Sequence, residues 1–169
     1  CSVLGSTVVL VDGVVGADAL AAGWWTSYWQ VPVLFHDGTR RLPQPTVEAL
    51  RRMQISNIVI LGGEERIPTF VARSAERLST ATSYRIAGRD RYETSVMMAK
   101  YLGGWFPTGR AEEFRNSVVC LAPSGKYQSE TAAWVDAITA GPWCAKASDA
   151  LSERGGPTRA LLPLNGASP

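Results

Sequence analysis

The sequence predicts an α/β protein in three layers, with a mostly parallel sheet built from repeated units. Short runs of β-branched and aliphatic residues alternate along the chain with segments of helical pattern. Most of these runs are continuously apolar, which is typical of strands buried on both faces. Strands that alternate with helices favour right-handed crossovers and parallel pairing. We therefore expect helices on both faces of one sheet.

Six apolar runs are the predicted strands, at residues 7–11, 31–35, 57–61, 84–87, 117–121 and 159–162. The predicted helices lie between them, at about residues 19–28, 47–53, 68–78, 93–102 and 131–144. Asp18 and Thr46 are the expected N-caps of the first two helices, because a short polar side chain there can accept a hydrogen bond from an unpaired backbone N–H. Pro68 suits the first turn of the third helix.

An internal repeat organises the chain. An apolar run at 8–12 precedes an Asp-Ala-Leu block that starts at Asp18, and a similar run at 118–122 precedes an Asp-Ala-Ile block that starts at Asp136. An apolar strand follows each block. The sequence therefore predicts a first repeat unit with the opening helix of the next at residues 1–102, a connecting loop at 103–116 and a partial second unit at 117–169.

Composition narrows the class of protein. The 169 residues are 46% hydrophobic and 19% charged, the balance of a soluble globular domain with a core. A net charge of +2 is too small to make nucleic acid an expected partner, and no apolar run approaches the roughly 20 residues that span a membrane. One histidine and three cysteines are too few for a structural zinc site, so neither a metal nor a cofactor is expected.

The start of the chain suggests a piece cut from a longer polypeptide. The sequence opens at Cys1 without Met, and the first predicted strand follows within a few residues. Lipid modification of Cys1 and a disulfide from Cys1 to Cys144 both stay open. A bridge from Cys120 to Cys144 is disfavoured, because the intervening helix carries the two residues to opposite ends of a strand.

Three motifs resemble the type 2 cell-wall-binding repeat of Gram-positive bacteria. They are the ten-residue stretch Arg85-Ile-Ala-Gly-Arg-Asp-Arg-Tyr-Glu-Thr94, the two Asp-Ala-Leu/Ile blocks and Val59-Ile-Leu-Gly-Gly63. Their order matches the family from residue 7 to about 164. The first unit lacks its own Arg-Ile-x-Gly start, and the second stops before its Gly-Gly strand.

The resemblance carries further implications. It implies a Toprim-like, more broadly Rossmann-like, α/β fold and non-covalent attachment to anionic wall polymers. It also implies modules packed in threes about an axis and a place beside an effector domain in secreted surface-layer proteins or wall hydrolases. We therefore predict a non-catalytic module that anchors a larger secreted protein at the cell wall. A self-assembling envelope scaffold is the alternative, and an enzyme of phosphate or nucleotide chemistry the more distant one.

The charged turn at the start of the ten-residue motif has two interpretations. Asp90 is expected to cap the following helix and Arg91 to pair internally, whereas Arg89 is free to grip phosphate or uronate. Asp18 and Asp136 are interpreted as helix caps rather than a nucleophile or metal ligand. Gly62 and Gly63 are expected to form a tight turn after their strand.

Tryptophans and the single histidine are the other candidate binding residues. Trp25 and Trp143 occupy equivalent positions in the two blocks, so shared packing is expected for both. Trp24 and Trp29 have no counterpart and are candidates for stacking on sugar rings or a partner. His36 is expected to be an exposed loop residue, because no nucleophile motif supports a triad with Asp37 and Ser124.

The polymer site is expected outside the carboxyl ends of the strands, where ligands of parallel α/β sheets usually bind. That edge would gather Asp12, Gly13, His36, Asp37, Arg40, Arg41, Gly62, Gly63, Arg89 and Lys126. The family points partly to the strand Pro32–Phe35, and the Arg40–Arg41 pair follows it directly. The predicted polymer-binding residues are Arg40, Arg41, Arg89, Pro32, Leu34, Trp24 and Trp29.

Self-association is the last expectation. The helix that carries Trp24, Trp25, Tyr28 and Trp29 has aromatic residues on more than one face. An interrupted repeat would leave this helix uncovered, and identical copies usually cover such a patch with closed symmetry. We expect a trimer first and a dimer second, or contact with neighbouring repeats.

Overall fold

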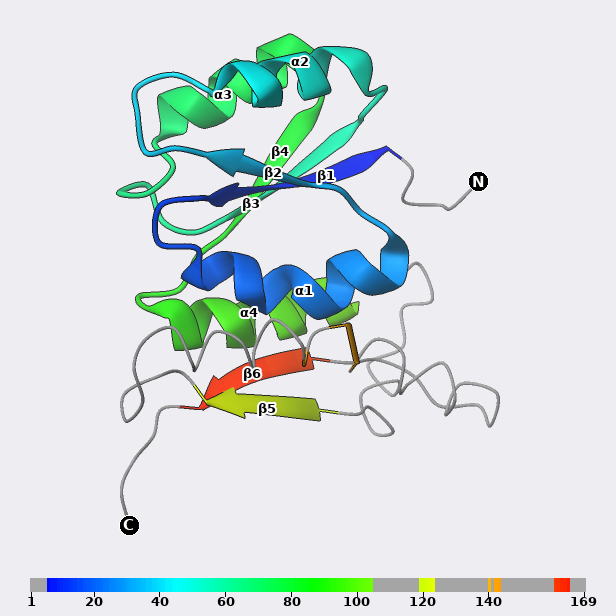
Figure 1. Ribbon diagram of the computed structural model, residues 1–169, viewed down its shortest axis with the longest axis vertical. Coiled ribbons are helices and arrows are strands. Elements are labelled where there is room, and N and C mark those ends of the chain that lie inside the picture. Colours follow the sequence, from blue (N-terminus) through cyan, green and yellow to red (C-terminus); the bar gives the residue numbers. More distant parts are fainter. Residues whose placement is uncertain (1–5, 105–118, 124–139, 141, 144–159, 165–169) are drawn as a thin grey trace.

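The central sheet has four parallel strands in the order β2-β1-β3-β4. The computed structural model describes residues 6–104, 119–123, 140, 142–143 and 160–164. The strands are β1 (Thr7–Asp12), β2 (Val33–His36), β3 (Asn57–Leu61) and β4 (Thr82–Ile86). The helices are α1 (Ala17–Trp29), α2 (Gln44–Arg52), α3 (Thr69–Ser79) and α4 (Arg91–Gly104). Figure 1 shows α2 and α3 on one face of the sheet and α1 and α4 on the other, which confirms the predicted α/β fold.

Alternation along the two inner strands divides the core into halves. Successive side chains of a strand point to opposite faces, so a continuously apolar strand supplies both halves. Val9, Val11 and Leu61 pack in the cluster that includes residues of α1 and α4. Leu10 and Ile60 pack in the cluster that includes residues of α2 and α3. The apolar runs noted in the sequence are therefore strands covered on both sides.

Two of the predicted helix caps are wrong. Gly16 occupies the N-cap of α1 with φ 68, and Asp18 lies within the first turn. Pro43 occupies the N-cap of α2, which begins two residues earlier than Thr46. Proline is pre-organised for a helix start, so the Pro-rich segment before Thr46 sets the boundary. The Thr46 hydroxyl instead donates to the Phe35 carbonyl oxygen at 2.7 Å and ties α2 to β2.

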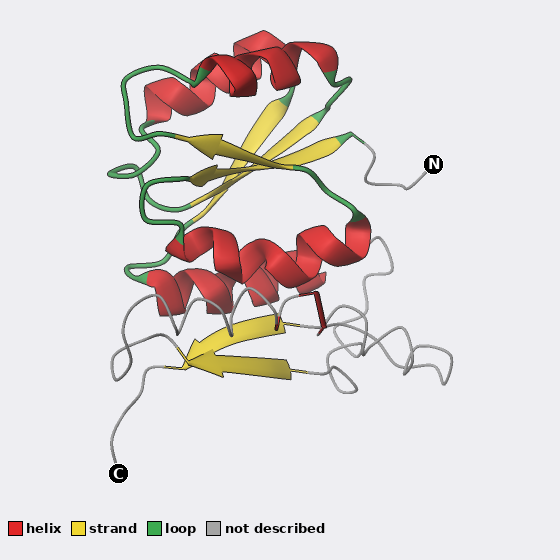
Figure 2. Cartoon of the chain, viewed as in Figure 1, coloured by secondary structure: helices red, strands yellow, loops and turns green. Residues whose placement is uncertain are grey.

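A second parallel pair lies beyond α1 and α4 (Figure 2). Strand β5 (Val119–Pro123) pairs in parallel with β6 (Ala160–Leu164), as β1 pairs with β2. The strand pair thus recurs where the sequence repeat predicts it. Both α1 and α4 contact β6, so these helices lie between two sheets. No helix in the described part of the chain is long and apolar enough to cross a membrane.

The tryptophans of α1 belong to the core rather than to the surface. Trp24 is 2% and Trp25 is 1% exposed, and Trp29 packs against the same cluster. The expectation of an uncovered aromatic face was wrong, because α4 and β6 of the same chain contact α1. No uncovered aromatic face of α1 therefore supports the expected homo-oligomer. Trp25 packs in the core, whereas Trp143 is 66% exposed and does not share that core packing.

Candidate functional site

The carboxyl ends of the four central strands meet along one edge, as predicted. In the strand register Asp12 pairs with His36, and Leu61 pairs with Ile86. The edge therefore gathers the segments that follow each strand, including the Arg40–Arg41 pair, Gly62 and Arg89. Lys126, Ser124 and Asp136 lie outside the described residues.

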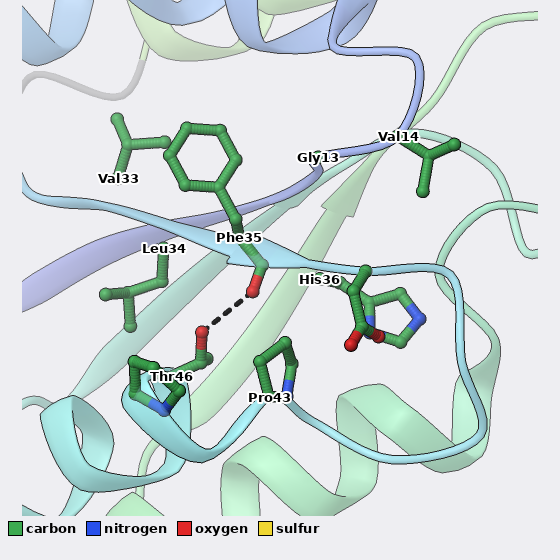
Figure 3. Close-up of a pocket in the computed structure, with 10 residues that line it drawn as sticks. Gly13, Val14, Val33, Leu34, Phe35, His36, Pro43 and Thr46 are labelled. Atoms are coloured by element: carbon green, nitrogen blue, oxygen red, sulfur yellow. Dashed lines mark hydrogen bonds and ion pairs between the residues drawn. The ribbon is translucent and has the colours of Figure 1, made fainter.

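A groove of about 480 Å³ opens at this edge, between the ends of β1 and β2 and the start of α2. Its walls are Gly13, Val14, Val33, Leu34, Phe35, His36, Asp37, Pro43, Pro45 and Thr46. Figure 3 shows Val33 and Phe35 on one side of β2 and Leu34 and His36 on the other. A Cβ on Gly13 would lie 3.2 Å from the His36 carbonyl oxygen, so glycine keeps β1 and β2 close at the mouth.

Apolar surface dominates this groove. Phe35 is 52% exposed and Val14 is 65% exposed, unusually open for large apolar side chains. Pro32 is also exposed and Leu34 is half-buried. Phe35, Pro43 and Pro45 are not among the predicted polymer-binding residues, because a continuous apolar run does not reveal that β2 is an edge strand. The proline spacing before α2 was the available signal.

The Arg40–Arg41 pair stands in a tight turn beside the groove. Asp37 Oδ1 accepts hydrogen bonds from the Thr39 backbone N–H at 3.0 Å and from the Thr39 hydroxyl at 2.7 Å. The Thr39 oxygen also lies 2.9 Å from the Arg41 carbonyl oxygen. Both arginine side chains are exposed. The turn thus presents two guanidinium groups to solvent directly after the groove-lining residues.

His36 is buried, which corrects the expectation of an exposed loop residue. The strand continues one residue further than predicted, and alternation places His36 on the inward side with Leu34. Its side chain is 0% exposed, and neither ring nitrogen has a hydrogen-bond partner. The Nδ1 atom lies 4.0 Å from Asp37 Oδ1.

Arg85, the first residue of the ten-residue motif, has a structural role. One guanidinium nitrogen donates to the Gly62 carbonyl oxygen at 2.6 Å and the other to the Ile67 carbonyl oxygen at 2.7 Å. Burial lowers the pKa of Arg85, and the charge of Glu64 opposes this shift. Gly62 itself has φ 111, a conformation that favours glycine, and so forms the predicted tight turn. Arg85 therefore fixes the β3–α3 loop and is not available to a polymer.

The rest of the motif builds the start of α4. The Asp90 carboxylate accepts the backbone N–H groups of Tyr92 at 3.0 Å and Glu93 at 2.9 Å, which confirms the predicted cap. The Glu93 carboxylate reaches back to the backbone N–H of Arg89 at 2.6 Å, in the manner of a capping box. The backbone and side-chain hydrogen bonds that Arg89 donates lower the pKa of Glu93. The Arg89 side chain is 91% exposed, although its Nε is paired with Glu93 at 3.0 Å.

Asp18 lies in the interior of the edge rather than in the groove. Burial raises the pKa of its carboxyl group, and a hydrogen bond with Thr94 and the charge of Arg91 oppose the shift. A Cβ on Gly62 would lie 2.8 Å from Asp18 Oδ2. Asp18 therefore joins the first turn of α1 to the β3 turn and the start of α4. Among the described residues, no three acidic, histidine or cysteine side chains gather as a metal site would require.

The predicted binding residues divide into two groups. Arg40, Arg41, Pro32 and Leu34 lie in or beside the groove, and Arg89 lies in the turn after β4 at the far side of the same edge. Trp24 is buried in the core and offers no surface to a polymer, and Trp29 is half-buried against the same core. Neither tryptophan lines the groove, because both side chains pack in or against the hydrophobic core.

Comparison with known proteins gives these features a context. Residues 85–152 match the model of the family described as cell wall binding domain 2. Over 98 residues the chain is 33% identical to N-acetylmuramoyl-L-alanine amidase LytC of Bacillus subtilis (strain 168), covering 58% of this chain and 19% of the amidase.

Two solved structures share the fold. Cwp6 from Clostridium difficile has a TM-score of 0.71 at 22% identity, covering 96% of this chain and 22% of that protein. Cwp8 from Clostridium difficile has a TM-score of 0.65 at 18% identity, covering 94% of this chain and 27% of that protein. The chain thus spans about a quarter or less of each relative. The chain therefore contains a type 2 cell-wall-binding repeat, a kind of repeat that occurs in secreted proteins associated with the cell wall.

Proposed function

We propose that this chain is a non-catalytic module that anchors a larger protein by holding an anionic wall polymer in the groove beside β2. The observation that carries the proposal is the pairing of an open apolar groove with the adjacent Arg40–Arg41 turn. Apolar and aromatic walls suit the faces of sugar rings, and guanidinium groups bind phosphate or carboxylate in a bidentate manner. Together they suit a polymer of sugars that carries negative charge.

Three features favour binding over catalysis. Arg85 and Asp90 of the family motif are occupied by backbone hydrogen bonds, and Asp18 is wedged between secondary-structure elements. The His36 side chain is fully buried beside Asp37, and the Thr46 hydroxyl in the same groove is held by the Phe35 carbonyl oxygen. The amidase activity named for the Bacillus relative is therefore not assigned to this chain.

Purified chain should be incubated with isolated Gram-positive cell walls, intact or chemically stripped of their secondary polymers. We expect the chain to sediment with intact walls and to remain in the supernatant with stripped walls. Because the attraction is partly ionic, added salt should reduce sedimentation. Equal sedimentation with stripped walls would exclude the anionic polymer as the ligand.

A further inference from the structure

His36 is the feature of the groove that polymer binding leaves unexplained. It is the single histidine of the sequence and its side chain is fully buried. Within the described residues, its two ring nitrogens are the buried side-chain polar atoms that lack a hydrogen-bond partner. Histidine is the side chain whose charge ordinarily changes between about pH 5 and pH 8. The groove lining thus contains a buried imidazole with unpaired ring nitrogens.

Protonation changes the hydrogen-bond partners that this imidazole requires. The neutral ring has one donor and one acceptor, whereas the protonated ring has two donors and a charge that must be paired when buried. The Asp37 Oδ1 atom lies 4.0 Å from Nδ1, about 1 Å beyond a charge-assisted hydrogen bond. Asp12, its register neighbour on β1, already accepts the backbone N–H groups of Val14 and Val15.

The groove lining at the start of α2 carries no charge. The groove-lining residues at its start are Pro43, Pro45 and Thr46, and all three are uncharged. The remaining charges of the neighbouring turn are the exposed guanidinium groups of Arg40 and Arg41. Asp37 is thus the partner that a protonated His36 would recruit.

The Asp37 oxygen that lies 4.0 Å from the ring is the one that already accepts from Thr39, so an imidazolium that binds this oxygen competes with Thr39. The same Oδ1 atom accepts both the backbone N–H and the hydroxyl of Thr39, and Thr39 in turn contacts Arg41. Hydrogen bonds from Thr39 hold the pKa of Asp37 below its ordinary value, so the carboxylate stays ionised while a histidine titrates. Its side chain is 51% exposed.

We propose that His36 is a pH-sensitive latch on the turn that carries Arg40 and Arg41. Protonation draws the Asp37 carboxylate from Thr39 to the imidazolium, releases the turn and neutralises the acidic charge beside the two arginines. An anionic ligand is then held more tightly under acidic conditions. The effect on ligand rests on the proposed function, whereas the movement of the turn does not.

Nuclear magnetic resonance can follow the latch without any ligand. The imidazole of the single histidine and the backbone amide of Thr39 are titrated between about pH 5 and pH 8. We expect both signals to change with one shared midpoint, and the Thr39 change to vanish in His36→Phe. A Thr39 amide that stays constant, or that moves equally in His36→Phe, would overturn the proposal. If His36→Phe does not fold, Asp37→Asn must abolish the Thr39 response instead.

Sedimentation with intact walls tests the consequence. The native chain should bind roughly two- to fivefold more tightly at about pH 5.5 than at about pH 8, the effect of one added charge near the surface. His36→Phe should show no such ratio. If the chain binds walls at neither pH, the proposed function is contradicted. The latch is then tested by the nuclear magnetic resonance titration alone. If wall binding is the same at both pH values while the Thr39 amide signal shifts, His36 does not control binding.

Discussion

Gly88 donates its backbone N–H to the Thr94 hydroxyl at 3.0 Å, across the turn that joins β4 to α4. The Thr94 oxygen also lies 3.0 Å from the Asp90 carbonyl oxygen. A Cβ on Gly88 would overlap the backbone nitrogen of Thr94 and lie 2.5 Å from Glu93 Cβ. The glycine of the Arg-Ile-x-Gly motif is therefore required by the close approach of two backbone segments.

Gly88→Ala should destabilise the chain by about 2–4 kcal/mol, because the blocking atoms belong to the backbone and cannot rotate away. Urea denaturation followed by circular dichroism measures the change. Gly63→Ala is the matched control, since a Cβ there meets nothing within 4 Å. Equal stability of the two variants would contradict the close approach.

Arg85→Lys should cost about 1–3 kcal/mol, because one ammonium group cannot reach the Gly62 and Ile67 carbonyl oxygens with the geometry of the guanidinium. Hydrogen exchange should show the residue 62–67 loop opening more often. Arg89→Lys is the control, because its pair with Glu93 is exposed to solvent and contributes little to stability. A loss of wall binding in Arg85→Lys with an unchanged melting temperature would argue for a ligand role instead.

Asp18 should make the chain less stable as pH rises. Its folded-state pKa lies above the ordinary value of 3.8, so the folded state binds its proton more tightly than the unfolded state does. The resulting stabilisation is complete below about pH 3.8 and is lost as the pH rises through the higher folded pKa. Asp18→Asn removes this dependence and should gain stability relative to the native chain between acidic and neutral pH. A difference in unfolding free energy between the two proteins that stays the same at every pH would contradict this prediction.

The double substitution Arg40→Glu with Arg41→Glu should weaken wall sedimentation at least tenfold, because four units of charge change beside the groove. The melting temperature should not change, since both side chains are exposed. Arg51→Glu with Arg52→Glu makes the same charge change at the far end of α2 and serves as the control. Equal weakening in both pairs would indicate a general charge effect rather than a site.

Trp24→Ala should cost about 3–5 kcal/mol, as expected for a large aromatic side chain removed from a core. Trp143→Ala should change stability by no more than about 0.5 kcal/mol, because that side chain is exposed. Chemical denaturation compares the two. A stable Trp24→Ala variant with impaired wall binding would return Trp24 to the binding surface.

Much of the architecture is determined by the sequence alone. Continuous apolar runs predict strands covered on both faces, and the observed β3 has the predicted bounds, Asn57–Leu61. The charged turn predicts its own cap, because Asp90 and the N–H groups that it accepts lie within three residues of one another. Local hydrogen bonding of this kind depends little on the rest of the fold, and so it is legible in the sequence.

Tertiary structure alone decided the other features. The environment of His36 depends on where β2 ends and which face α2 covers, and the burial of Trp24 depends on α4 and β6 contacting α1. Arg85 contacts residues 18 and 23 positions away along the chain. Such long-range contacts follow from how strands and helices pack in space, because side-chain burial is set by neighbours that sequence spacing does not specify.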